Sequence, residues 1–147
     1  YILGKGLPKP NLLYGTGMKL CIREGEKWQR GGTYINCEAE ENGEYCLKFQ
    51  LSFSRMDQPT EIATCFPYGY SEVQALFKQM CKRYPKLVQR QTIGRSVLGN
   101  EVECLVFAAS PTKPVIVVSA RVHPSETVSS FVAQGVMEWL VSSEEAH

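Results

Sequence analysis

The first half of the chain alternates hydrophobic and polar residues with the period of two that is typical of half-buried β-strands. The alternation is clearest over residues 45–53. Shorter stretches with the same period follow at residues 18–23, 33–37 and 61–66. A Gly/Pro-rich stretch at residues 1–17 predicts a loop or an extended arm. Because nothing before residue 68 has a helical period, the pattern predicts an all-β, sandwich-like unit.

The second half begins with a helical pattern and continues with a hairpin. Ser71 and Gln74 have the spacing of a capping box and predict a helix start, while Pro85 predicts its end. The predicted core face of this helix consists of Val73, Leu76, Phe77, Met80 and Cys81. Residues 87–93 and 101–108 have strand character, and the glycines and asparagine between them predict an antiparallel hairpin.

Residues 115–120 form a nearly unbroken apolar run, which is typical of a central strand covered on both faces. We expect a strand at 115–121 in the same sheet as the hairpin. A core helix should follow, with its apolar stripe at Val128, Phe131, Val132, Gly135, Val136, Trp139 and Leu140. The order helix, hairpin, strand, helix predicts an α/β unit with a mixed sheet. The fold class is therefore α/β, with an all-β domain at 1–67 and an α/β domain at 68–147.

Composition and charge fit a globular protein and exclude some partners. Apolar residues make up 44% of the 147 residues, and the net charge of +1 gives no case for a nucleic-acid partner. An acidic cluster consists of Glu38, Glu40, Glu41 and Glu44, and a basic cluster of Lys78, Lys82, Arg83, Lys86, Arg90 and Arg95. These clusters predict either two solvated faces or a basic surface that attracts acidic substrates.

The six cysteines include no C-x-x-C pair, and most lie within apolar strand or helix patterns. We expect reduced, mostly buried thiols and a cytoplasmic location. No apolar run reaches the roughly 18 residues that a membrane span needs, so no membrane partner is expected. The first residue is Tyr1 rather than Met, which indicates a processed or excised segment or an incomplete record.

The candidate chemistry lies at His123 and Glu126, between the predicted strand and the predicted last helix. This spacing brings an imidazole and a carboxylate to one turn, and these are two of the ligand types of a hydrolytic zinc site. The turn follows the carboxyl end of a buried strand, where α/β sheets place their ligand sites. The alternative is a surface histidine beside a glutamate that favours the helix dipole.

Two longer motifs carry a resemblance to a known family. Residues 119–127 read Ser-Ala-Arg-Val-His-Pro-Ser-Glu-Thr, and residues 66–71 read Phe-Pro-Tyr-Gly-Tyr-Ser. With the glycine-containing string at residues 91–102, they resemble the zinc metallocarboxypeptidases, and most of all the cytosolic carboxypeptidases that trim glutamates from tubulin. The subfamily has Gly where this chain has Ser125, and it carries a β-rich domain before its catalytic domain.

This resemblance implies a zinc enzyme of which the chain holds only the first part. His123 and Glu126 match the family's first two zinc (Zn2+) ligands. The third ligand, a downstream histidine, has no counterpart, and His147 is too close in sequence to be that residue. The residues that bind the substrate carboxylate and the general base are absent too, so no catalytic residue is assigned. The implied partner is a polypeptide with an acidic C-terminal tail, such as tubulin.

Several alternatives remain open from the sequence. The protein is either an active carboxypeptidase, a catalytically silent homologue, or a β-rich protein-binding module. Arg121 either has a functional role, facing the site or anchoring a substrate carboxylate, or has a structural role on its strand. Tyr68 and Tyr70 form either a binding platform or packing at the domain junction.

Overall fold

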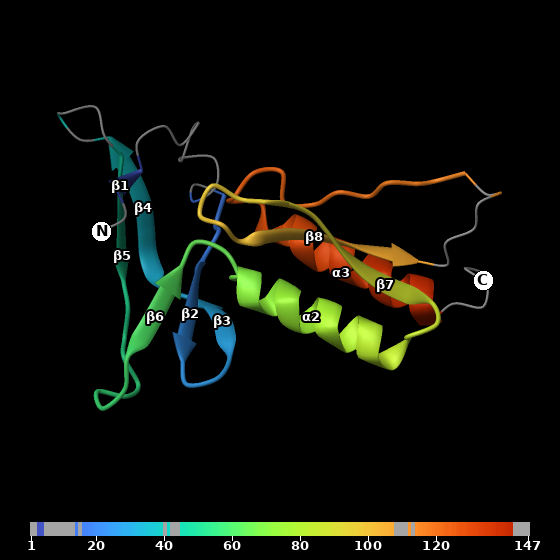
Figure 1. The fold of residues 1–147 in the computed structure, drawn as a ribbon. Coiled ribbons are helices and arrows are strands. Elements are labelled where there is room, and N and C mark those ends of the chain that lie inside the picture. Colours follow the sequence, from blue (N-terminus) through green and yellow to red (C-terminus); the bar gives the residue numbers. More distant parts are fainter. Residues whose placement is uncertain are drawn as a thin grey trace. The chain divides into compact units, whose positions relative to one another are not determined.

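The computed structural model describes residues 3–4, 14, 16–39, 41, 45–107, 112 and 114–142 (Figure 1). It divides into two compact units, Tyr1–Phe66 (unit 1) and Pro67–His147 (unit 2). Among the described residues the chain is rich in strands, and unit 2 holds two helices.

The described part of unit 1 contains two three-stranded sheets whose strand pairs are all antiparallel. The first sheet has the order β1 (Leu3–Gly4), β5 (Tyr45–Gln50), β4 (Thr33–Ala39), and the second the order β3 (Trp28–Gly31), β2 (Leu20–Glu24), β6 (Thr60–Ala63). Four of these strands overlap the strands that the alternation predicts. β1 and β3 were not predicted, because β1 is only two residues long and β3 is mostly polar.

The core of unit 1 is built around thiols and aliphatic side chains. Leu20 and Cys21 are both fully buried although they are neighbours on β2, so both faces of that strand are covered. Cys46 is fully buried on β5, and Cys37 is buried on β4 beside Tyr14. None of the six cysteines forms a disulfide. Three cysteines are buried and three are half-buried. The expectation of mostly buried thiols is therefore confirmed for three of the six.

We expect the stability of unit 1 to fall once the pH rises above the ordinary thiol pKa of 9.0. Burial raises the pKa of Cys21, Cys37 and the Tyr14 phenol, so the folded state keeps protons that the unfolded state has lost. The free energy of unfolding therefore falls in that window and is unaffected below it. Urea midpoints at rising pH, followed by Trp28 fluorescence in a Trp139→Phe background, measure this. A Cys21→Ala/Cys37→Ala variant with an equally steep pH dependence would contradict it.

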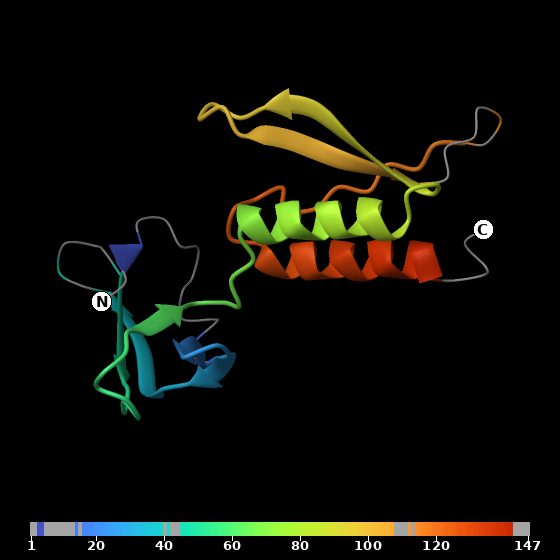
Figure 2. The ribbon, with the colours of Figure 1, turned by 60° about the horizontal axis from the view of Figure 1, so that its bottom comes forward.

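Unit 2 places two helices side by side next to a β-hairpin, as Figure 1 and Figure 2 show. Its elements are α2 (Tyr70–Arg83), β7 (Val88–Arg95), β8 (Glu101–Phe107) and α3 (Thr127–Ser142). The core joins Leu76, Phe77 and Met80 of α2 to Val88 and Val141, with Val73 and Cys81 packed against it. The predicted core face of the first helix is thus confirmed.

The start of α2 differs from the prediction. The N-cap is Gly69, and Ser71 lies inside the helix. The Glu72 carboxylate accepts a hydrogen bond from the Gly69 N–H at 3.0 Å. This is the half of a capping box in which the side chain of the third helical residue bonds back to the N-cap backbone. The prediction failed because it assigned the capping role to a hydroxyl two residues further on, whereas Gly69 has the extended backbone of an N-cap.

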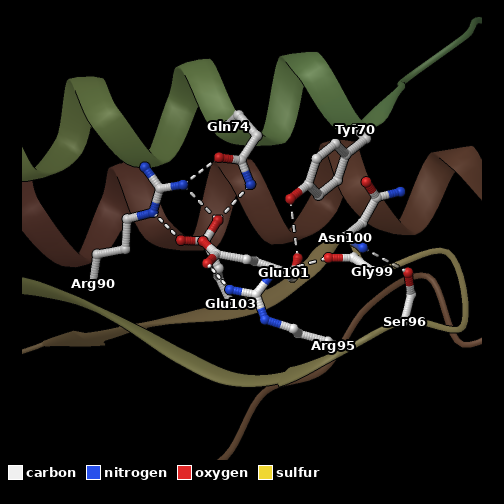
Figure 3. A network of polar contacts seen from close by, with 9 residues as sticks. All are labelled: Tyr70, Gln74, Arg90, Arg95, Ser96, Gly99, Asn100, Glu101 and Glu103. Carbon is white, nitrogen blue, oxygen red and sulfur yellow. Dashed lines mark hydrogen bonds and ion pairs between the residues drawn. The ribbon is translucent and has the colours of Figure 1, made fainter.

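The hairpin forms as predicted, with β7 and β8 antiparallel and a register shift between Thr92 and Gly94. In its turn Gly99 has φ +82°, a conformation that favours glycine. A polar network ties the hairpin to α2 (Figure 3): Arg90 donates to both oxygens of Glu103, and Gln74 bonds to both partners. These bonds, first of all that from Arg90, lower the pKa of the Glu103 carboxyl.

The network changes the interpretation of the basic cluster. Arg90 is half-buried against Glu103, and Arg95 forms an ion pair with Glu101 at 2.7 Å. The other members, Lys78, Lys82, Arg83 and Lys86, are exposed on α2 or just after it. The members that form no ion pair with a described residue therefore lie along α2 and just after it.

The predicted central strand at 115–121 is wrong for the described structure. The described sheet of unit 2 contains β7 and β8 alone, and residues 114–121 form no strand. Residues 115–118 are 64–86% exposed. A strand buried on both faces needs layers on both sides, and the described residues supply none there.

The predicted apolar stripe of the last helix also fails to form the core. Val128, Phe131, Val132 and Trp139 are 46–69% exposed on α3. The face that packs into unit 2 instead carries Thr127, Ser130, Gln134, Met137 and Val141, spaced by three or four residues. Since the exposed face is the more apolar of the two, α3 is typical of a helix that is covered on both sides.

Candidate metal centre

The candidate ligands lie in a tight turn that leads into α3. The Glu126 N–H donates to the His123 carbonyl at 3.1 Å, and the Thr127 N–H donates to the Ser125 carbonyl at 3.0 Å. The helix begins at Thr127, as the sequence predicts for the segment after this turn. The turn therefore holds the backbone of both candidate ligands immediately before the first helical residue.

The side chains of His123 and Glu126 are both exposed. The Glu126 carboxylate folds back and accepts a hydrogen bond from the His123 N–H at 3.4 Å, which brings it next to the residue that carries the imidazole. An imidazole nitrogen and a carboxylate oxygen fit zinc as a donor set. Within the described ranges no group of three His, Cys, Asp or Glu side chains could hold a metal ion. The turn thus offers two candidate ligands, and the described residues add no third.

Arg121 does not reach outward to a substrate in this structure. Its guanidinium donates to the Pro124 carbonyl at 2.9 Å and to the Tyr68 carbonyl at 2.8 Å. A longer bond of 3.4 Å reaches the Ser130 hydroxyl. Arg121 also has φ +61°, which is unusual for a residue other than glycine. Of the two roles left open by the sequence, the contacts favour the structural one.

Tyr68 and Tyr70 are fixed within unit 2 rather than arranged as a platform. The Tyr68 hydroxyl donates to Gln134 Oε1 at 2.9 Å, and its ring meets Phe131 edge-on with centroids 4.8 Å apart. Burial raises the pKa of Tyr68. The Tyr70 hydroxyl donates to the Glu101 carbonyl at 3.1 Å. Tyr68 thus anchors the segment before α2, and Tyr70 anchors the first residue of the helix.

Sequence reasoning missed Ser129. Its hydroxyl accepts the Arg121 N–H at 2.9 Å and donates to the Glu126 carbonyl at 2.7 Å. The available signal was a serine in the first turn of a helix, where the side chain bonds to a carbonyl three or four residues back. Next to this turn, Thr127 Oγ1 is buried with no hydrogen-bond partner among the described residues.

Comparison with known proteins identifies the family. The sequence profile of the zinc carboxypeptidases matches residues 73–147, slightly more than half of the chain. The chain belongs to the zinc carboxypeptidase family. The match includes the turn with His123 and Glu126, all of α3, and α2 from Val73 onward.

Relatives of this carboxypeptidase chain carry the name that the motif at residues 119–127 suggested. The chain is 32% identical to cytosolic carboxypeptidase 6 of Mus musculus, and the alignment covers 91% of the chain and 27% of the relative. It is 33% identical to cytosolic carboxypeptidase 2 of Danio rerio over 92% of the chain and 22% of the relative. The resemblance to cytosolic carboxypeptidases is therefore confirmed. The chain spans less than a third of the length of these relatives. Its described residues contain no helix long and apolar enough to cross a membrane.

Proposed function

We propose that the full-length protein containing this chain is a zinc-dependent metallocarboxypeptidase that removes C-terminal or side-chain glutamates from acidic tails such as that of tubulin. The observation that carries this proposal is the turn at His123 and Glu126, placed at the start of α3 inside the segment that matches the family. The relatives named cytosolic carboxypeptidases support the same assignment and a cytoplasmic location.

In this proposal His123 and Glu126 are the two zinc ligands that the chain supplies. His123 would bind through a neutral ring nitrogen and Glu126 through a carboxylate oxygen. Bound zinc would supply Lewis-acid chemistry, polarising a scissile carbonyl and lowering the pKa of a water molecule. The third ligand and the general base would come from other parts of the full-length protein. Residues 68–147 would form the N-terminal part of the catalytic domain, and residues 1–67 an all-β domain before it.

The preference for an acidic substrate rests on charge. Lys78, Lys82, Arg83 and Lys86 are exposed together on and after α2, and no described acidic side chain forms an ion pair with any of them. A stripe of cations raises the local concentration of an acidic tail and the rate of encounter with it. The effect weakens as salt screens the charges.

We expect the zinc-loaded full-length protein to release glutamate from a peptide ending in polyglutamate, with kcat/KM roughly 100-fold above that for a matched peptide ending in glutamines, because the glutamine tail leaves a cationic site unpaired. Released amino acid is quantified by mass spectrometry at low and high salt. Comparable release from both peptides would refute the acidic preference.

Two further outcomes separate the alternatives. A protein that binds zinc but releases no C-terminal residue from any peptide is a silent homologue. A protein that binds the acidic peptide tightly without zinc and without cleavage is a binding module.

A further inference from the structure

The segment that leads into the candidate metal centre is held in a strained conformation. Arg121 lies two residues before His123 and has φ +61°, in the left-handed region that side chains other than Gly, Asn and Asp rarely adopt. Such a conformation persists only where the surrounding structure over-determines it, and it is concentrated at functional sites. The contacts of Arg121 show what determines it here.

The Arg121 guanidinium joins three parts of unit 2. One bond goes to the Pro124 carbonyl, which lies between the two candidate ligands. Another goes to the Tyr68 carbonyl, in the segment before α2, and a third to the Ser130 hydroxyl in the first turn of α3. The planar guanidinium has five N–H donors in a fixed arrangement, and one ammonium group does not reproduce this geometry. The middle of the ligand turn is thereby tied to the segment before α2 and to the first turn of α3.

The Ser129 hydroxyl closes the same turn at its two ends. It accepts the Arg121 N–H and donates to the Glu126 carbonyl, so it links the residue before the turn to the second candidate ligand. Together, Arg121 and Ser129 fix the start, the middle and the end of residues 121–126. The Tyr68 carbonyl that receives the guanidinium is itself held, since the Tyr68 side chain is buried against α3.

We propose that Arg121 is a positioning residue for the metal centre: it holds the His123–Glu126 turn in the conformation that binds zinc, with Ser129 as its partner. The inference rests on the proposed function, because it requires these two residues to be the ligands. Arg121 contacts neither the metal nor the substrate in this role. It sets the orientation of the ligands before the metal arrives, and outer partners of this kind are typically worth 10–100-fold in metal affinity.

The test compares substitutions in the full-length protein. Arg121→Gly removes the guanidinium while accepting the left-handed backbone, so backbone strain does not explain its effect. Arg121→Lys keeps the charge and loses the geometry, and Ser129→Ala removes a single hydroxyl. Arg55→Ala is the matched control, because the exposed Arg55 guanidinium bonds to the Asp57 carboxylate within unit 1. The readouts are zinc affinity by chelator competition, the visible spectrum of the cobalt-substituted protein, and hydrogen exchange of residues 119–131 in the metal-free protein.

We expect Arg121→Gly and Arg121→Lys to bind zinc about 10–100-fold more weakly, with altered cobalt spectra and faster exchange at residues 121–126. Ser129→Ala should shift in the same direction, and Arg55→Ala should match the wild type. Wild-type zinc affinity and cobalt spectrum in all three variants, with His123→Ala still unable to bind, would overturn the positioning role and leave the proposed function intact. Equal zinc affinity in wild type and His123→Ala would overturn both.

Discussion

Replacing His123 or Glu126 by alanine in the full-length protein is expected to abolish stoichiometric zinc binding and peptidase activity. A catalytic zinc is held by three protein ligands with one position open for water, so each of these residues would supply a third of the protein's coordination. Losing the metal removes several kcal/mol of transition-state stabilisation, which corresponds to a rate loss of at least about 1000-fold. Atomic absorption on the purified variants and glutamate release from a polyglutamylated peptide measure both effects.

The same turn offers a close control. Ser125 lies between the two candidate ligands and is exposed. A Ser125→Gly variant should therefore keep its zinc and its activity. All of these side chains are exposed, so unfolding temperatures of the metal-free variants should stay close to that of the wild type. Full zinc content and full activity in His123→Ala and Glu126→Ala would show that the two residues are not ligands.

The fold was predictable where the local pattern and the local structure depend on the same residues. Alternation located β5 because Leu47 and Phe49 pack into the core while Lys48 and Gln50 are exposed. The hairpin followed from strand character and turn glycines, and Gly99 indeed has a positive φ. β3 escaped detection because Trp28 is its one large apolar residue, half-buried with the Arg23 guanidinium 5.1 Å from its ring centre.

For the candidate site, the sequence alone could predict the two candidate ligands and the turn that carries them, but not the contacts that hold the turn. The spacing of His123 and Glu126 marked the turn, and the following helix begins where the pattern places it. The role of Arg121 was not accessible, because it depends on a positive φ and on a carbonyl 53 residues earlier in the chain. No local pattern encodes such a contact. The third ligand stays a prediction about other segments of the full-length protein.

The exposed apolar surface of unit 2 leads to the second large effect. Residues 115–118 are 64–86% exposed, and Val128, Phe131, Val132 and Trp139 present a second apolar face on α3. Soluble proteins rarely leave contiguous apolar surface of this kind uncovered. We expect other segments of the full-length protein to cover it and to convert residues 115–120 into the buried strand that their apolar run predicts.

Val117→Glu tests this expectation, because its cost depends on what covers the side chain. In the 147-residue chain Val117 is 84% exposed, so the substitution should change the free energy of unfolding by less than about 0.5 kcal/mol. In the full-length protein the same change would bury an unpaired carboxylate and should destabilise by at least about 3 kcal/mol. Urea unfolding of both pairs of proteins gives the comparison. An equally small change in the free energy of unfolding in the 147-residue chain and in the full-length protein would mean that residues 115–120 stay exposed.

The 147-residue chain should also bind zinc far more weakly than the full-length protein and should show no peptidase activity. Structural zinc sites with four protein ligands bind with about 10–16 kcal/mol, so each ligand contributes roughly 3 kcal/mol. Two ligands in place of three should thus weaken binding by at least about 100-fold. Chelator competition on both proteins, with His123→Ala of each as the blank, measures the ratio. An equal affinity in the short chain would place a third ligand within its own residues.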